Sequence, residues 1–550
     1  MLDKVNKRGM GKLLKKPRRI FTLDCETDPF LYGREVKPFI WGLYDGSTFK
    51  HFKRVDELVR YLASIRGVVY AHNGGRFDFL FLQDYFETGK PVRLINGRVA
   101  EFRIGQCIFR DSFLILPTPL ASYKKEKIDY RIFEKDKRDR PGNAAKILDY
   151  LRLDCVYLFE LVASYRAQYG GNITLASSAM NFFKNKGEEK IPVPVTSKHF
   201  YTRFSEFYHG GRVSCFKVGT GRTPFKVYDL NSAYPYAMKF DHPWEEDFEV
   251  LSGVIPKETG RSFIRLETES LGVFAVRNED TSLDFPDDGV RREFCITGWE
   301  YLAAKETGTL GKPKIIESYV FPHKMNFTKY VDHFYGLKET LDKDSKEYLF
   351  AKLFLNSLYG KFAANPENYS DYLVVKAGEI GKYESLVYTF EGYIGSKNQL
   401  ALLSKPLDEL RYYNVATAAS ITGFVRAKLW RAIRHSKNPL YCDTDGLAAG
   451  KLNLPISKRI GDWKIEFSGN RYAVAGKKLY AFNDGSKWTG WGEEGKTPKG
   501  WKIASKGVRI TGPEIFRIAE GETIKYNKPA PSFSLKGGQR FISRDIRRTR

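Results

Sequence analysis

Residues 441–445 restrict the fold more than any other segment, because they read Tyr-Cys-Asp-Thr-Asp between two short apolar stretches. This pattern predicts a β-hairpin that carries Asp443 and Asp445 at its tip. Two carboxylates held this close repel each other unless cations lie beside them. The chain must therefore fold so that the tip faces metal ions or basic groups.

A third acid, Asp229, ends a predicted strand far upstream of the hairpin. If the two strand ends meet, Asp229, Asp443 and Asp445 form one acidic pocket. Hard oxygen ligands of this kind select Mg²⁺ or Mn²⁺. Two such ions in one pocket can activate a hydroxyl group and neutralise a pyrophosphate leaving group, so the pocket predicts phosphoryl transfer.

Residues 351–360 lie between these strands in the sequence and predict a helix. Lys352, Asn356 and Tyr359 would then lie along one helix face. This set suits a nucleotide, with Lys352 near its phosphates and Tyr359 beneath the nascent base pair. The alternative is an amphipathic helix with a solvated lysine and a core tyrosine.

The first third of the chain carries four more candidate acids. Asp24 and Glu26 follow an apolar strand and project from one face of it, and Asp78 follows a strand and a glycine turn. Tyr150 and Asp154 are four residues apart on a predicted helix and therefore share a face. Together they predict a second two-metal site that cleaves phosphodiesters, with Tyr150 orienting the water. Each motif alone could equally be a solvated chain segment.

Taken in order, these segments resemble the motifs of family-B DNA polymerases. The polymerase motifs are matched by Asp229-x-x-Ser232-x-Tyr234-Pro235, Lys352-x-x-x-Asn356-Ser357-x-Tyr359-Gly360 and Tyr441-x-Asp443-Thr444-Asp445. The exonuclease motifs are matched by Asp24-x-Glu26, by Asn73 with Phe77-Asp78, and by Tyr150-x-x-x-Asp154. The resemblance implies a DNA-directed DNA polymerase with a proofreading 3′–5′ exonuclease. It also implies two Mg²⁺ or Mn²⁺ ions at each site, bound by the seven acids.

The resemblance assigns roles to further residues. Lys125 would assist exonucleolysis. The nucleotide would contact Leu230, Lys352, Asn356, Tyr359 and Tyr234, whose ring would exclude a 2′-hydroxyl. DNA would contact Asn73, Phe77, Ser112, Tyr208, Gly210, Gly211, Ser232, Ser357, Gly360, Thr444, Lys478 and Tyr480. The chain departs from the family pattern at Phe113, Ala233 and Gly446, none of which removes a carboxylate.

The implied fold is a multidomain α/β and α+β chain, with an RNase H-like exonuclease domain before a right-hand polymerase domain. Asp24 lies so early that we expect no large domain before it, and the motif intervals leave room for two insertions. Both features resemble the protein-primed subfamily of small linear-genome phages. In that subfamily one insertion docks a terminal protein that provides the priming hydroxyl, and the other encircles the template. Synthesis there is processive and displaces the non-template strand.

The expected domains follow the motif spacing. They are a basic arm (1–19), the exonuclease (20–189), a linker with the start of the palm (190–244), the first insertion (245–340), the fingers helix (341–365), the second insertion (366–405), the palm (406–475) and the thumb (476–550). Within the second insertion, residues 372–375 followed by Gly378 and Gly381 predict a hairpin.

Composition agrees with a nucleic-acid partner. The formal net charge is +25, which favours a polyanion, and aromatic residues, on which bases stack, make up 15% of the chain. No apolar run of about 18 residues predicts a membrane helix. The six cysteines are scattered and form no zinc pattern, which fits a reducing compartment. We expect a monomer in the cytoplasm or the host-cell cytoplasm, of the viral or mobile-element origin that the resemblance implies.

Three alternatives remain open at this point. The chain could extend nucleic-acid primers only. It could be a nuclease with a vestigial palm. It could also be a DNA-binding protein without catalysis.

Overall fold

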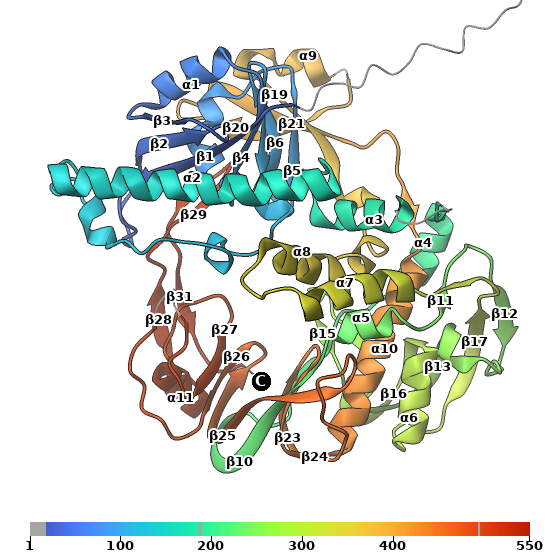
Figure 1. The fold of residues 1–550 in the computed structure, drawn as a ribbon. Helices are drawn as coiled ribbons and strands as arrows, with labels where there is room; N and C mark the ends of the chain where they lie inside the picture. Colours follow the sequence, from blue (N-terminus) through green and yellow to red (C-terminus); the bar gives the residue numbers. More distant parts are fainter. Residues whose placement is uncertain (1–17, 186–189, 385, 493–495, 550) are drawn as a thin grey trace, which may run out of the picture.

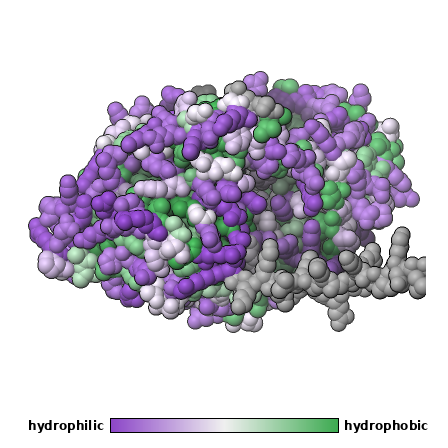
Figure 2. Space-filling view, turned by 90° about the horizontal axis from the view of Figure 1, so that it is seen from above, coloured by the Kyte–Doolittle hydropathy of each residue, from purple (hydrophilic) through white to green (hydrophobic). Residues whose placement is uncertain are grey.

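The computed structural model describes residues 18–185, 190–384, 386–492 and 496–549. Almost all of the expected basic arm lies outside these ranges. The chain forms an amino-terminal lobe and a carboxyl-terminal lobe, with the long helix α2 (Pro141–Tyr169) lying between them (Figure 1). Within the described ranges, no helix is both long and apolar enough to span a membrane. Seen from above, the molecular surface is mostly hydrophilic, with scattered hydrophobic patches (Figure 2).

One large sheet forms the amino-terminal lobe. Its strand β1 is largely buried, because β2 and β4 pair with its two edges and α2 packs across it. The helix buries Leu151, Leu158 and Val162. The strand order is β20 (Thr389–Ile394), β21 (Leu400–Pro406), β19 (Ser370–Lys376), β5 (Pro91–Ile95), β6 (Arg98–Ile104), β7 (Cys107–Asp111), β4 (Gly67–Ala71), β1 (Ile20–Thr27), β2 (Pro38–Tyr44) and β3 (Phe49–Phe52).

The segment expected as the second insertion extends this sheet. β19 pairs with β5, placing Tyr372 opposite Val92 and Leu373 opposite Pro91. The predicted hairpin turn at Gly378 and Gly381 is wrong, because β19 pairs with β21 and the two glycines lie in short helical segments, the second of which is α9 (Gly381–Glu384). Neither glycine has the positive φ that a tight hairpin turn favours.

A second sheet forms the floor of the carboxyl-terminal lobe. β10 (Gly219–Leu230) runs along its centre, so the residues at the carboxyl end of β10 have neighbours on both sides. The strand order is β27 (Trp501–Ser505), β26 (Leu479–Asn483), β25 (Trp463–Gly476), β10, β24 (Gly446–Leu452), β23 (Ser436–Asp443) and β9 (Val213–Cys215). The buried helix α10 (Val415–Arg434) contacts β23 and β24.

The segment expected as the first insertion contains a third sheet and the helix α7 (Thr328–Thr340). The sheet order is β12 (Glu249–Ser252), β17 (Lys314–Val320), β13 (Ser262–Leu271) and β16 (Asp287–Thr297), followed along the chain by α6 (Gly298–Glu306). Helix α7 follows that sheet in the chain and packs against α8 (Lys346–Leu355). Only α8 lies in the segment expected as the fingers. The expected boundary at residue 340 therefore falls inside a packed helix pair.

Short helices and strand pairs complete the described fold. The helices are α1 (Val55–Ala63), α3 (Leu175–Asn185), α4 (Lys198–Ser205), α5 (Ala233–Ala237) and α11 (Gly512–Glu520). The strand pairs are β8 (Val195–Thr196) with β22 (Tyr412–Tyr413), β11 (His242–Pro243) with β18 (Lys324–Met325), β14 (Val276–Arg277) with β15 (Leu283–Asp284), β28 (Ile524–Asn527) with β31 (Ser543–Ile546), and β29 (Ser532–Ser534) with β30 (Gly538–Arg540).

The predicted helix 351–360 is too long at its carboxyl end. α8 ends at Leu355, and Asn356 caps it with φ −101° and ψ 0°. The side chain of Asn356 donates a hydrogen bond to the Lys352 carbonyl at 2.8 Å, which competes with continuation of the helix. Tyr359 follows in a separate 3₁₀ turn, so Lys352, Asn356 and Tyr359 do not share one continuous helix face.

A hairpin near the carboxyl end returns to the amino-terminal lobe. This hairpin, β29–β30, places Leu535 in the amino-terminal core, where the side chain is 5% exposed. The Gln539 amide donates to the Val36 carbonyl at 2.7 Å and accepts from the Val36 backbone N–H at 2.9 Å. Residues from both ends of the sequence therefore build one lobe. The predicted domain boundary between residues 189 and 190 did not include this contribution from the carboxyl end.

A buried ion pair joins α6 to α10. Arg426 on α10 and Glu300 on α6 are each 2% exposed, and Arg426 Nε lies 2.8 Å from Glu300 Oε1. Arg426 also donates to the backbone carbonyls of His209 and Gly210. One guanidinium therefore holds two helices and the segment that joins the lobes.

We predict that Glu300→Ala destabilises the fold by about 3–5 kcal/mol, because it leaves the Arg426 charge buried without its partner. The matched control is Glu306→Ala on the same helix. Glu306 pairs with Arg431 of α10 at 2.5 Å, but this pair is exposed, so its loss should cost about 0–1 kcal/mol. Urea unfolding of both variants measures the difference, and equal shifts would contradict the assignment.

Candidate active sites

Three neighbouring strands bring the predicted polymerase acids together. Asp229 at the end of β10 and Asp443 at the end of β23 both pair with Gly446 of β24, one from each side. Asp445 lies in the hairpin turn, and its carbonyl accepts a hydrogen bond from the Leu230 backbone N–H at 2.9 Å. The ends of β10 and β23 therefore lie on either side of β24, close to each other as predicted.

Lysines form ion pairs with two of the three acids, Asp229 and Asp443. Lys464 Nζ lies 2.8 Å from Asp229 Oδ2, and Lys478 Nζ lies 2.6 Å from Asp443 Oδ1. Burial, followed by the charge of Asp229, raises the pKa of Asp445 to about 6. These three acids are not among the described groups whose oxygens all lie within 4.8 Å of one another.

The acids line a pocket of about 360 Å³ at the hairpin tip. Tyr480, Lys478 and Thr444 also line it. Thr444 adopts a left-handed φ of 59° and donates to Asp443 Oδ1 at 3.0 Å. Tyr480 is buried and packs on Tyr441 with 4.7 Å between ring centroids. The predicted ligands of the primer end therefore surround the acidic tip.

Two predicted nucleotide ligands stack on each other. The rings of Tyr234, on α5, and Tyr359 are parallel within 2°, with centroids 4.5 Å apart. The neighbouring Ser232 has a left-handed φ of 51°, which turns the chain from β10 into α5. Burial raises the pKa of both phenols, and the charge of Asp445 adds to this effect, so the stacked rings lie near the acidic tip.

The remaining predicted ligands of the polymerase site differ in exposure. Lys352, Asn356 and Gly360 are exposed, whereas the Leu230 side chain is buried, so Leu230 can offer only its backbone to a ligand. The Ser357 hydroxyl donates to the Leu353 carbonyl and is thus occupied within the protein.

The predicted linker motif contacts the catalytic hairpin. A Cβ atom on Gly211 would lie 2.7 Å from Thr444 Cγ2, so only glycine allows this close approach. The Thr444 backbone N–H donates to the Arg212 carbonyl at 2.7 Å. Tyr208 is partly buried, and Gly210 is exposed. Because Arg426 holds the adjacent backbone, the segment between the lobes is fixed against the acidic tip.

The amino-terminal acids form a tighter cluster. Asp24, Glu26 and Asp154 each offer an oxygen within 4.8 Å of the other two. Asp78 begins a 3₁₀ helix rather than an α-helix, is 2% exposed, and lies outside this closest set. Burial, and next the charge of Asp78, raise the pKa of Asp24 well above its usual range, which places Asp78 electrostatically beside the cluster.

This cluster fits divalent cations. One oxygen each of Glu26, Asp78 and Asp154 is buried and has no hydrogen-bond partner within the described chain. Burial raises the pKa of Asp78 to about 7 and that of Glu26 well above its usual value. Unpaired carboxylate oxygens this deep are unfavourable, and hard cations such as Mg²⁺ or Mn²⁺ would satisfy them.

Tyr150 and Lys125 border the same cluster. Lys125 Nζ lies 2.8 Å from Asp154 Oδ2 and 5.1 Å from the centre of the Tyr150 ring. The Tyr150 hydroxyl lies 2.9 Å from that of Tyr130, and burial raises the pKa of Tyr150. The phenol therefore stays protonated. All these residues line a pocket of about 540 Å³ together with Phe77 and Phe30.

The predicted primer-end ligands of this lobe divide into two kinds. Phe77 lines the pocket and packs against Phe533 of the carboxyl-terminal hairpin, with 5.1 Å between ring centroids. Asn73 has a left-handed φ of 61°, and its side-chain oxygen accepts from Arg98 at 2.8 Å. Ser112 is fully buried and bonds the Ala71 carbonyl, so its hydroxyl faces the core and not a bound strand.

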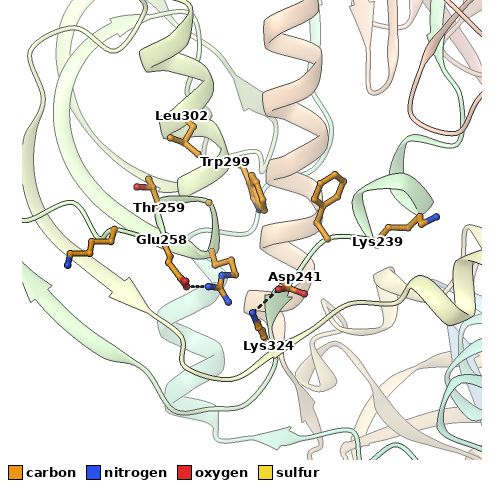
Figure 3. Close-up of a pocket in the computed structure, with 11 residues that line it drawn as sticks. Lys239, Asp241, Glu258, Thr259, Trp299, Leu302 and Lys324 are labelled. Carbon is orange, nitrogen blue, oxygen red and sulfur yellow. Dashed lines mark ion pairs between the residues drawn. The ribbon is translucent and has the colours of Figure 1, made fainter.

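A third pocket, of about 620 Å³, lies between α6 and the segment that follows α5 (Figure 3). Glu258 pairs with Arg261, and Asp241 pairs with Lys324 at 3.0 Å. Lys239, which pairs with Asp332 at 2.8 Å, and Lys257 add two further cations to the lining, which also includes Trp299. This pocket contains none of the predicted metal ligands.

Sequence reasoning missed several residues at these sites. Arg426 could have been found from the sequence, because a charged residue within the otherwise apolar stretch of α10 indicates a buried ion pair. Lys464 could not, because its position beside Asp229 depends on the register of β25 against β10. Tyr130 and Arg98 also belong to no motif. Their contribution is a hydrogen bond to a predicted site residue, between Tyr130 and Tyr150 and from Arg98 to Asn73.

Comparisons with known proteins show which family the chain resembles. The family model for DNA polymerase type B, organellar and viral, matches residues 119–457. A DNA-directed DNA polymerase of Enterobacteria phage PRD1 is 37% identical, and the match covers 96% of this chain and 98% of that protein. A probable DNA polymerase of Neurospora intermedia is 24% identical, and that match covers 84% of this chain and 59% of the relative.

The overall fold is also known. The phi29 DNA polymerase, solved with primer-template DNA and incoming nucleotide, superimposes with a TM-score of 0.72 at 18% identity. That match covers 97% of this chain and 100% of the phi29 chain, which confirms the predicted fold class. The matches to the family model and to the phage PRD1 enzyme confirm the family expected from the motifs, and the chain belongs to the organellar and viral type B DNA polymerases.

Proposed function

We propose that this DNA-directed DNA polymerase extends a primer at the Asp229–Asp443–Asp445 pocket and removes mispaired 3′ ends at the Asp24–Glu26–Asp154 cluster. The observation that carries the proposal is the presence of two separate acidic sites in one chain, one at the ends of β10 and β23 and the other between β1 and α2. The phi29 enzyme, whose fold this chain shares, was solved with primer-template DNA and nucleotides, which supports these as the ligands of the carboxyl-terminal lobe.

At the polymerase pocket, Asp229, Asp443 and Asp445 would hold two divalent cations, which when bound supply charge stabilisation for the primer hydroxyl and the leaving pyrophosphate. Tyr359 supports the nascent base pair, and the Tyr234 ring stacked on it blocks a 2′-hydroxyl. Lys478 can move from Asp443 to the primer terminus. The contribution of these side chains is positioning and charge stabilisation.

At the amino-terminal cluster, Asp24, Glu26, Asp78 and Asp154 would hold the second cation pair. The protonated Tyr150 hydroxyl, fixed by Tyr130, orients the attacking water. Phe77 and Phe30 at the mouth of the pocket stack on the bases of a frayed strand. Lys125 stabilises the negative charge that develops on the phosphate.

Removal of one carboxylate from each site should separate the two activities. We predict that Asp443→Asn lowers nucleotide incorporation by about 10²- to 10³-fold or more and leaves degradation of single-stranded DNA intact, because the sites share no ligand. Asp154→Asn should do the reverse. Primer extension and single-strand degradation assays, run on the same preparations, measure both rates.

The matched control is Asp149→Asn on the same helix as Asp154. Asp149 is exposed and pairs with Arg152 at 2.7 Å, so both activities should be retained. Incorporation that survives in Asp443→Asn would show that the acids of the hairpin are not the metal ligands. Loss of both activities in either variant would show that the two sites are not independent.

We also propose that synthesis starts on a hydroxyl of a terminal protein docked at the first insertion, and that it displaces the non-template strand. The pocket in Figure 3 supports this place for docking, because bases outnumber acids on its lining and Trp299 offers an apolar surface. Such a lining suits an acidic segment of a partner. The alternative is extension of nucleic-acid primers alone.

Incubation with the candidate terminal protein and one labelled deoxynucleotide should give a covalent protein–nucleotide product. We predict that Lys257→Glu lowers this product several-fold and leaves extension of a DNA primer unchanged, because Lys257 is exposed and has no ion pair in the described ranges. Lys305→Glu, exposed on α6 and outside the pocket, is the control. If the wild-type chain forms no adduct but extends DNA primers, protein priming is wrong.

A further inference from the structure

The loop that carries Lys125 has no regular secondary structure of its own. Residues 124–129 lie between two 3₁₀ turns and form neither helix nor strand. Nevertheless Lys125 Nζ lies 2.8 Å from Asp154 Oδ2 and 5.1 Å from the centre of the Tyr150 ring. A flexible side chain on an irregular loop loses conformational entropy when it is fixed in this way. The loop therefore needs further contacts that hold it against α2.

Glu160 of α2 holds the chain just before Lys125. Its Oε2 atom accepts a hydrogen bond from the Tyr123 hydroxyl at 2.7 Å and lies 3.0 Å from Lys124 Nζ. One carboxylate thus binds two consecutive residues, and these two directly precede Lys125 in the chain.

Tyr157, one helical turn before Glu160, holds the chain just after Lys125. Its hydroxyl donates a hydrogen bond to Glu126 Oε1 at 3.0 Å. The Lys124 amine also lies over its ring, 5.4 Å from the ring centre, which adds a cation–π attraction. Since Tyr157 and Glu160 are three residues apart on α2, they are neighbours on its surface. Together they bind the loop on both sides of Lys125.

These two anchoring residues lie outside the pocket of the amino-terminal cluster. Lys125, Tyr150 and Asp154 line that pocket, whereas Tyr157 and Glu160 do not. None of the exonuclease motifs gives Tyr157 or Glu160 a role. Both follow Asp154 on the same helix, so α2 provides the acid that Lys125 contacts and also the anchors of the loop that delivers Lys125.

We propose that Tyr157 and Glu160 are positioning residues of the exonuclease, which act by holding Lys125 beside Asp154. Because Lys125 stabilises charge that develops on the phosphate, its displacement lowers kcat and leaves binding of the strand unchanged. The inference rests on the proposed exonuclease function. It goes beyond that function by naming two residues outside the motifs and the side-chain contacts through which they act.

We predict that Glu160→Gln lowers kcat for degradation of single-stranded DNA by about fivefold, since an exposed ion pair contributes modestly. Glu160→Gln combined with Tyr157→Phe should lower it by about tenfold, because both sides of the loop are then released. The KM should stay within about twofold of the wild type, since Phe77 and Phe30 are unaffected. Steady-state degradation of a labelled oligonucleotide measures both constants, and primer extension should be unchanged.

Limited trypsin digestion gives a readout that does not depend on catalysis. A released loop is a better protease substrate, so cleavage within residues 124–127 should be several times faster in the combined variant than in the wild type. The matched control is Asp149→Asn, which removes an exposed acid of α2 that pairs with Arg152 of the same helix and not with the loop. It should match the wild type in both digestion and degradation.

A double-mutant cycle separates the positioning of Lys125 from a general structural role. Lys125→Ala alone should lower kcat by about 10²-fold. In that background Glu160→Gln should change kcat by less than about twofold, because the lysine that Glu160 positions is already gone. Exchange of the ion pair, Lys124→Glu with Glu160→Lys, should recover most of the kcat that Glu160→Gln loses.

The outcomes distinguish this inference from the function on which it rests. Unchanged kcat or unchanged trypsin cleavage in the combined variant, in an enzyme whose exonuclease still requires Asp154, would overturn the inference alone. It would also be overturned by an equal fall in kcat in the Lys125→Ala background, or by a rise in KM at constant kcat. If the wild type degrades no single-stranded DNA, the proposed exonuclease fails and the inference fails with it.

Discussion

Repulsion between carboxylates is the constraint on which both sites depend. Asp229, Asp443 and Asp445 are forced together by the pairing of β10 and β23 with β24, and the amino-terminal acids are forced together by packing of α2 on β1. Each arrangement is tolerable only with cations nearby. The two sites meet this need differently. Lysines contact Asp229 and Asp443 at the carboxyl-terminal site. At the amino-terminal cluster a lysine contacts only Asp154, and one buried oxygen each of Glu26, Asp78 and Asp154 has no partner within the described chain.

The lobes are tied together close to both sites. Arg426 binds the backbone of His209 and Gly210 from the buried side, and Gly211 packs on Thr444 at the tip of the acidic hairpin. From the carboxyl end, Phe533 packs on Phe77 at the mouth of the amino-terminal pocket. A strand that leaves one site for the other would therefore pass between elements whose relative positions are fixed by buried contacts.

The sequence allowed both acidic sites to be predicted, because strand and helix periods place Asp24 with Glu26 and Tyr150 with Asp154, and the hairpin pattern places Asp443 with Asp445. It did not allow prediction of contacts that depend on register or on tertiary packing. Lys464 meets Asp229 only through the pairing of β25 with β10, and β19 joins the amino-terminal sheet through β5. The end of α8 at Leu355 was missed because the Asn356 side chain competes with the helix backbone.

The most direct test of two independent acidic sites is a crystal structure of the protein soaked in Mn²⁺ and a non-hydrolysable deoxynucleotide, with anomalous scattering measured at the manganese edge. The account predicts anomalous peaks at Asp24, Glu26 and Asp154, and separate peaks at Asp229, Asp443 and Asp445. Peaks at neither cluster, or at one cluster alone, would contradict it.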